Sequence, residues 1–207
     1  MKLCVFDFDS TLMDGETIDI LALSFGRGGE IAAITCEAMN GKLDFFEAIT
    51  RRAAALKGMR YDEVVRICEN LPLMKGAIEC VGELKRRGYK VVVFSGGFHI
   101  ATDPAVVKLG ADAAFANILR REGDFLTGQV GGEMLFDFSK GDMLRRVQSL
   151  LGVAAEDTVA VGDGANDRAM FRYAKTKIAF CAKEILKKEA TVAIEKKDLR
   201  LVLEHIA

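Results

Sequence analysis

Two aspartates near the start of the chain are the residues best suited to chemistry. Asp7 and Asp9 follow a short apolar run, Leu3–Phe6, so they stand where a buried strand would end. Side chains of a strand alternate between its two faces, which would let both carboxylates point the same way. Like charges placed so close repel each other, and they persist where a cation or a reaction uses them. We therefore expect chemistry at this strand end, with a divalent metal taking part.

Two further apolar runs also lead into polar residues. Ser95 follows Val91–Phe94, and Asp163 comes shortly after Thr158–Val161. In open α/β sheets, ligands bind beyond the carboxyl ends of the strands. The sequence therefore predicts that these polar residues share one site with the aspartate pair.

The elements that must position these residues alternate along the chain. Further strand-like runs are Ile178–Phe180 and Val192–Ile194, and helical patterns such as Ala77–Arg87 and Asp142–Leu151 each end at a glycine. Apolar runs without polar alternation indicate strands buried on both faces. This order predicts an α/β fold with a doubly wound, mostly parallel sheet and a Rossmann-like core.

The stretch between the first two strands is longer than a crossover requires. Residues 14–70 contain helical patterns and no convincing strand, whereas a crossover takes about a dozen residues. We expect them to form a helical cap inserted after the first strand, with residues 1–13 and 71–207 forming the core domain. Residues 115–133 should add a small β-hairpin flap that turns at Glu122–Asp124.

The composition is that of an ordinary globular protein. Half of the 207 residues are hydrophobic, and 29 basic residues balance 30 acidic ones. The lack of a long basic stripe argues against nucleic acid as a partner. The five cysteines form no C-x-x-C pair, and we interpret them as buried free thiols of a reducing compartment. No signal peptide or stretch approaching the ~20 apolar residues of a membrane span is visible, so we predict a cytoplasmic protein without a membrane partner.

Four short motifs carry a resemblance to a known family. In this order, they resemble the motifs of the haloacid dehalogenase-like phosphatases: Asp7–Leu12, Ser95–Gly97, Lys140 before Gly141 and Asp142, and Gly162–Asp167. The match is closer still to the phosphoserine phosphatases of that superfamily, which the stretch Glu37–Phe45 also resembles. The resemblance implies magnesium-dependent hydrolysis of O-phospho-L-serine to L-serine and phosphate, the last step of serine biosynthesis, through an aspartyl-phosphate.

The resemblance also implies roles for individual residues. Asp7 would attack phosphorus, and Asp9 would protonate the leaving alkoxide and then deprotonate water. Mg²⁺, which takes oxygen ligands, would be held by a set of acidic residues: Asp7, the backbone carbonyl of Asp9, and Asp163, with Asp167 nearby. Lys140 would act in catalysis by placing a positive charge against the phosphoryl oxygens. The substrate would contact Lys140 and three further residues: Ser95, Gly96 and Asn166.

Substrate choice would come from the cap. On the expected cap helix, Arg52 falls within the apolar stripe that contains Phe45 and Ile49, whereas Arg51 points away from it. A guanidinium on an apolar face needs an anionic partner, either an internal acid or the carboxylate of an amino-acid substrate.

Two interpretations remain open for each of three further residues: Glu16, Met39 and Phe45. Glu16 either starts a helix or holds the ammonium group of the substrate. By resemblance, Met39 and Phe45 are apolar walls of the site, while core packing explains both equally well. If Arg52 and Glu16 are structural, the alternative is a broad-specificity small-molecule phosphatase or phosphotransferase on the same core. The sequence leaves open whether the protein is a monomer or a homodimer.

Overall fold

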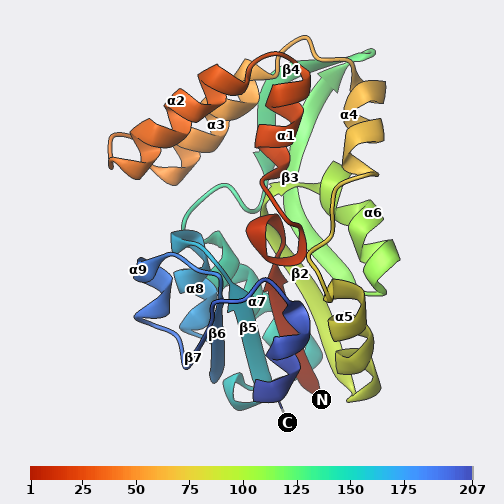
Figure 1. The fold of residues 1–207 in the computed structure, drawn as a ribbon, viewed down its shortest axis with the longest axis vertical. Coiled ribbons are helices and arrows are strands. Elements are labelled where there is room, and N and C mark those ends of the chain that lie inside the picture. The colour runs from red at the N-terminus through yellow and green to blue at the C-terminus, as the bar shows by residue number, and fades with distance from the viewer. Residues whose placement is uncertain (207) are drawn as a thin grey trace.

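The structure, a computed structural model that describes residues 1–206, is built around a seven-stranded sheet (Figure 1). The strands lie in the order β4-β3-β2-β1-β5-β6-β7. All neighbouring pairs are parallel except β3 with β4. Their bounds are β1 Lys2–Asp7, β2 Tyr89–Phe98, β3 Ala113–Glu122, β4 Phe125–Gly132, β5 Thr158–Gly162, β6 Thr176–Phe180 and β7 Val192–Ile194. The predicted doubly wound α/β fold is confirmed, and the strand order reverses between β1 and β5.

Helices connect and cover the strands. Their bounds are α1 Thr17–Ser24, α2 Gly28–Met39, α3 Phe45–Ala55, α4 Tyr61–Cys68, α5 Ala77–Arg86, α6 His99–Leu109, α7 Ser139–Leu151, α8 Arg168–Phe171 and α9 Glu184–Lys187. The predicted glycine stop of α7 is confirmed, because Gly152 follows it with a φ of 64°, a left-handed conformation that glycine adopts without strain. None of the helices in residues 1–206 is long and apolar enough to cross a membrane.

The central strands β1, β2 and β5 are buried on both faces, as the continuous apolar runs predicted. Cys4 and Phe6 of β1 pack into a cluster that reaches α5 and α6. Leu3 and Val5 pack on the opposite face, against residues of α7 and α8. Full burial of an aliphatic side chain contributes about 1.5–3 kcal/mol, so this central strand is firmly anchored.

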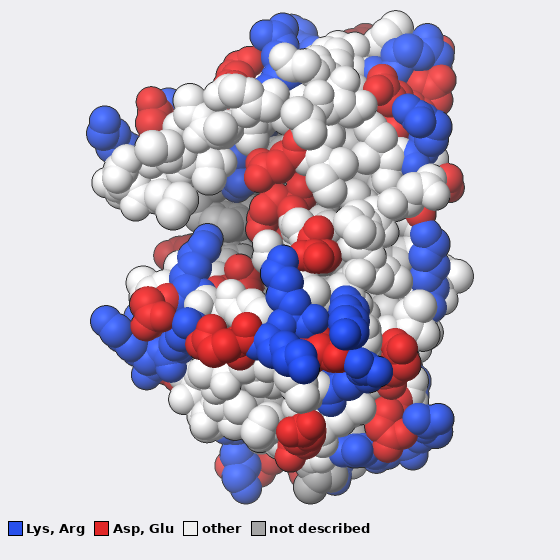
Figure 2. Space-filling model, viewed as in Figure 1, with Lys and Arg blue, Asp and Glu red and all other residues white. Residues whose placement is uncertain are grey.

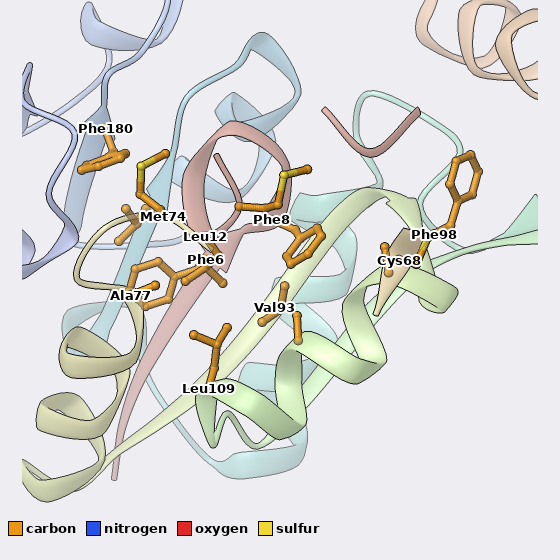
Figure 3. Packing of buried hydrophobic residues seen from close by; sticks show 14 of the residues in the cluster. Phe6, Phe8, Leu12, Cys68, Met74, Ala77, Val93, Phe98, Leu109 and Phe180 are labelled. Atoms are coloured by element: carbon orange, nitrogen blue, oxygen red, sulfur yellow. The ribbon is translucent and has the colours of Figure 1, made fainter. Parts of the chain in front are cut away.

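A tight turn, Phe8–Leu12, follows β1 and is held by the core. Phe8 and Leu12 are fully buried, and Figure 3 shows them among the packed side chains of the cluster. Within the turn, Asp9 is extended and Ser10 has a φ of 58°. The expectation that Asp7 and Asp9 alternate along one strand is therefore wrong. Asp7 ends the strand, and the turn brings Asp9 back towards the same edge of the sheet.

Helices α1–α4 lie beyond the carboxyl ends of the central strands, and the hairpin β3–β4 reaches up to them (Figure 1). The hairpin turns at Gly123 and Asp124, as predicted. Its far half is bonded to the loop between α3 and α4: the N–H of Gly58 donates to the carbonyl of Leu126, and the N–H of Leu126 to that of Met59, both at 2.9 Å. These bonds cover part of an edge strand and tie the helices to the sheet.

The cysteines are free but not all buried. Cys4, Cys68 and Cys80 are buried, whereas Cys36 is exposed and Cys181 is half-buried. The expectation of buried thiols is wrong for the last two. Cys36 lies on α2, of which only one residue, Ile31, is buried.

Candidate active site

The predicted residues meet around a cavity of about 480 Å³ at the carboxyl ends of the strands. Figure 2 shows the hollow between the projecting helices α2 and α3 and the part of the molecule that carries α8 and α9. Nine of the predicted residues line the cavity: Asp7, Asp9, Glu16, Met39, Phe45, Arg52, Gly96, Asp163 and Asn166. The other three lie behind its wall and are at most 2 % exposed: Ser95, Lys140 and Asp167.

Three carboxylates and one ammonium form a cluster at the floor of the cavity, which Asp7 and Asp163 line while Asp167 and Lys140 lie behind them. The Nζ of Lys140 lies 2.6 Å from Oδ1 of Asp7 and 2.6 Å from Oδ1 of Asp167. Burial and the charge of Asp167 raise the pKa of Asp7 well above its usual range, against the opposing effect of Lys140. Burial, with the charge of Asp167, also raises the pKa of Asp163 to about 6. If all three acids were ionised, their negative charge would exceed what Lys140 neutralises, and the raised pKa values of Asp7 and Asp163 partly reflect this repulsion.

Lys140 stays charged although it is buried. Burial alone would lower the pKa of its ammonium, but the carboxylates of Asp167 and Asp7 raise it. Asp167 is also held from its other side, because its Oδ2 accepts the N–H groups of Asp163 at 3.0 Å and Gly164 at 2.9 Å. Asp167 therefore fixes both the lysine and the loop after β5.

The donor set fits a hard divalent cation. Oxygens of Asp7, Asp163 and Asp167 all lie within 4.8 Å of one another. Carboxylate oxygens are the ligands that Mg²⁺ prefers. A dication there would also offset the negative charge that remains beside Lys140.

The carboxylate of Asp9 is held between α1 and the end of β2. Its Oδ1 accepts the N–H of Thr17 at 2.7 Å and the hydroxyl of Thr17 at 2.6 Å. Its Oδ2 accepts the hydroxyl of Ser95 at 3.3 Å. The Oγ of Ser95 in turn accepts the N–H of Gly97 at 2.9 Å. These hydrogen bonds therefore fix the orientation of the Asp9 carboxylate through both of its oxygens.

Side chains that lie very close to the backbone explain why two glycines follow Ser95. A Cβ at Gly96 would lie 2.8 Å from Cζ of Phe45, and a Cβ at Gly97 would lie 2.7 Å from Oδ2 of Asp9. Neither glycine has a left-handed φ, so glycine is required at these positions by the lack of room for a Cβ and not by the backbone conformation. The half-buried Phe45 thus brings α3 down onto the last residues of β2.

Arg52 reaches the cavity without an ion-pair partner. Its Nε donates a long bond of 3.4 Å to the carbonyl of Ala48, and no carboxylate of residues 1–206 pairs with it. Asp19 feels its charge at longer range, since Arg52 opposes the burial that raises the pKa of Asp19. Arg51 instead lies outside and pairs with Glu37 at 3.3 Å, as the periodicity predicted. The described residues thus supply no internal acid that pairs with Arg52.

Glu16 and Met39 lie at the cavity in different settings. Glu16 precedes α1, and its Oε1 accepts the hydroxyl of Ser10 at 2.7 Å. Burial, with the charge of Asp9, raises the pKa of Glu16 to about 7. Met39 is 73 % exposed at the rim, so the core-packing interpretation is wrong for it.

The sequence interpretation missed a buried residue that supports the site. Asn117 of β3 is fully buried. Its Nδ2 donates to the carbonyls of Gly96 at 3.0 Å and Met134 at 3.1 Å, and its Oδ1 accepts the N–H of Met134 at 2.9 Å. The signal was present, since an asparagine within an apolar strand needs buried partners. Asp137 and Lys183, which also line the cavity, had no such signal.

Comparisons with known proteins agree with this geometry. The sequence model of the haloacid dehalogenase-like hydrolases matches residues 1–175. The phosphoserine phosphatase of Wolinella succinogenes is 60 % identical over 206 residues, which cover 100 % of both chains. The chain belongs to the phosphoserine phosphatase family of haloacid dehalogenase-like hydrolases. It is therefore an enzyme, as the motifs predicted.

Other members of the family show the same agreement. The phosphoserine phosphatase of Methanocaldococcus jannaschii is 49 % identical over 205 residues, which cover 99 % of this chain and 97 % of the relative. A solved structure of a phospho-aspartyl intermediate analogue of phosphoserine phosphatase matches with a TM-score of 0.95 at 48 % identity, over 100 % of this chain and 99 % of the other. A substrate-bound phosphoserine phosphatase complex gives the same score and identity, over 100 % and 98 %.

Proposed function

We propose that this hydrolase converts O-phospho-L-serine to L-serine and phosphate with Mg²⁺, which would complete serine biosynthesis. One observation carries the proposal: a single cavity joins the Asp7–Asp9 pair to Glu16 and to Arg52, which has no ion-pair partner among residues 1–206. Phosphoserine has a phosphate for the acid pair, a carboxylate for Arg52 and an ammonium for Glu16. The names of the full-length relatives support the same substrate.

In the first half of the reaction, an oxygen of Asp7 bonds to phosphorus and the bond to the serine oxygen breaks. Asp9 gives its proton to that leaving oxygen. The Nζ of Lys140 and the N–H of Phe8 both hold Oδ1 of Asp7, at 2.6 and 2.7 Å, and so orient the nucleophile. In the second half, Asp9 takes a proton from water, the water oxygen bonds to phosphorus, and the bond to Asp7 breaks to release phosphate.

The metal site would use the acids of the cavity floor. Asp7, Asp163 and the backbone carbonyl of Asp9 would hold Mg²⁺, with Asp167 nearby, and the ion would supply positive charge to the phosphoryl oxygens. Asp167 already accepts Lys140 and two backbone N–H groups, so its part is to hold the lysine and the loop. Ser95, Gly96 and Asn166 would contact the substrate.

Residues 14–70 would act as a cap on a core of residues 1–13 and 71–207, with the hairpin of residues 115–133 as a flap of the core. The contact of Phe45 with Gly96 supports this division, because it brings α3 of the cap onto the end of β2 in the core. Phe45 and Met39 would then form apolar walls that exclude water from the reacting groups.

Released phosphate tests the proposal. With Mg²⁺, phosphoserine should be hydrolysed much faster than simple aryl phosphates, and a chelator should abolish turnover. Mass spectrometry of rapidly quenched enzyme should find phosphate on the peptide that contains Asp7, and Asp7→Asn should remove both the adduct and the turnover. Comparable rates on aryl phosphates would instead favour the broad-specificity phosphatase, and an adduct on another residue would end the mechanism.

A further inference from the structure

Thr17 makes an unusual pair of contacts with the acid–base residue. It is the first residue of α1, is 1 % exposed, and gives both its N–H and its hydroxyl hydrogen to the same oxygen, Oδ1 of Asp9. These distances of 2.7 and 2.6 Å are those of strong bonds to a charged acceptor. Glu16, the residue before the helix, makes no side-chain bond to cap it. The N–H and the hydroxyl of the first residue of α1 therefore both bind the carboxylate of Asp9.

We propose that Thr17 is a positioning residue that decides which oxygen of Asp9 carries the proton. Two donor hydrogens from Thr17 point at Oδ1, so that oxygen has no room for a proton of its own. The acidic proton must therefore lie on Oδ2, the oxygen that faces Ser95 and Gly97 at the end of β2.

The consequence for the reaction follows from proton transfer. A proton moves between groups only when the heavy atoms come within about 2.6–3.2 Å of each other. A carboxyl group that turns freely about its last bond would present the protonated oxygen only part of the time. With Thr17 holding Oδ1, Oδ2 gives its proton to the leaving serine oxygen and later takes one from water. This role rests on the proposed phosphatase function.

Three threonine variants make the test. Thr17→Val removes the hydroxyl but keeps the shape and the backbone N–H, and Thr17→Ser keeps a hydroxyl. Thr102→Val is the matched control, because Thr102 is fully buried and its hydroxyl has no hydrogen-bond partner in residues 1–206. Each variant is first checked by its melting temperature and then compared with wild type on phosphoserine and on an aryl phosphate, whose leaving group needs no proton.

The phosphorylation step separates positioning from general damage. With Thr17→Val, phosphorylation of the enzyme by phosphoserine in a single turnover should slow by about 10- to 100-fold, the effect of one bond to a charged group. Phosphorylation by the aryl phosphate should change by less than about threefold, because that step needs no acid. Dephosphorylation should slow whichever substrate supplied the phosphoryl group, so the phospho-enzyme should accumulate with the aryl phosphate, whose phosphorylation step stays fast. Thr17→Ser should stay within about threefold of wild type, and Thr102→Val should match it.

Equal slowing of phosphorylation by both substrates, or a Thr17→Ser variant no better than Thr17→Val, overturns the inference. A fall in melting temperature with unchanged rates also overturns it, since Thr17 would then be structural. If wild type and Thr17→Val hydrolyse phosphoserine equally well, the proposed function stands and only this inference is wrong. If wild type does not hydrolyse phosphoserine, the proposed function is wrong instead. The variants are then measured on the ester that wild type does hydrolyse.

Discussion

At the scale of single residues, the neighbouring arginines of α3 offer the sharpest comparison. Arg52 faces the cavity and has no ion pair within the described part of the chain, residues 1–206. Arg51 faces outward and pairs with Glu37, both partners being about half exposed. Removing one partner of a buried charge pair costs about 2–5 kcal/mol, whereas an exposed pair contributes about 0–1 kcal/mol. The two side chains are thus chemically matched but differ in their surroundings.

We predict that Arg52→Ala lowers kcat/KM for phosphoserine by roughly 30-fold to several thousand-fold, since ~1.4 kcal/mol is tenfold. A phosphate ester without carboxylate and amine should be hydrolysed nearly as before. Arg51→Ala should affect neither substrate. Steady-state kinetics of both variants on both substrates decide the matter, and equal damage to the two esters by Arg52→Ala would show that Arg52 is structural.

The raised pKa of Glu16 gives a second prediction at this scale. Glu16 must be ionised to hold an ammonium, and its pKa in the free enzyme is about 7. The ratio of kcat/KM for phosphoserine to that for an ester without the amino group should therefore rise as the pH increases through about 7. Taking a ratio cancels the titration of the acids of the enzyme that act on both esters. Glu16→Gln should flatten this ratio, and a ratio in wild type that is constant from pH 6 to 8 would argue against the role.

The raised pKa of Glu16 also predicts how the free energy of unfolding changes with pH. A carboxyl whose pKa is higher in the folded state than the usual value of ~4.3 holds its proton more tightly when folded. Its ionisation therefore lowers the free energy of unfolding as the pH rises from about 4.3 through about 7. Relative to wild type, Glu16→Gln should gain stability between pH 4 and pH 8, as urea unfolding at the two pH values would show.

At the scale of elements, the contact between α3 and the end of β2 depends on Gly96. We predict that Gly96→Ala destabilises the protein, because its Cβ would lie 2.8 Å from Cζ of Phe45. Adding Phe45→Ala should relieve the collision, so a double-mutant cycle in the free energy of unfolding should show coupling of about 0.5–3 kcal/mol. Gly82→Ala on α5, where a Cβ would meet no atom within 4 Å, is the control and should be neutral or stabilising. Additive effects of the two substitutions would contradict the contact.

The sequence predicted the elements whose signals are local. The strands β1, β2 and β5 are apolar runs buried on both faces, and α7 ends at a glycine. The residues at the ends of these strands could be placed in one site because parallel strands direct their carboxyl ends to one edge. Arg52 and Arg51 were separable because helical periodicity places them on different faces.

Other features depend on contacts that a local pattern does not contain. Thr17 reaches back to Asp9 because a tight turn with Ser10 in a left-handed conformation reverses the chain. The exposure of Cys36 and Met39 follows from the projection of α2, since periodicity marks an apolar face but not whether another element covers it. Burial of a side chain therefore could not be predicted for a helix that has neighbours on one side only.

At the scale of the whole molecule, aromatic rings join the helices above the cavity to the core below. Phe46 of α3 stacks on Phe136, with ring centroids 5.4 Å apart, and Phe136 stacks on Phe138 at 5.3 Å. Phe136 and Phe138 belong to the segment between β4 and α7, which leads into Lys140. All three rings are between 41 % and 55 % exposed, so they contribute less to the core than to this bridge.

We predict that Phe136→Leu raises KM for phosphoserine while changing the melting temperature little. Each aromatic pair contributes ~0.5–1.5 kcal/mol beyond its buried area, and Phe136 belongs to both pairs. Loss of the bridge should therefore let α3 leave the core more often and lower the fraction of enzyme whose cavity is complete, which raises KM by up to about tenfold per pair. Phe125→Leu on β4 is the control, because Phe125 is similarly exposed at 48 % and its ring lies 5.9 Å from the guanidinium of Arg60 rather than in the stack. If both variants change KM equally, or if neither does, the stack is only a surface cluster, and Phe45 on Gly96 remains as the contact that holds α3 over the cavity.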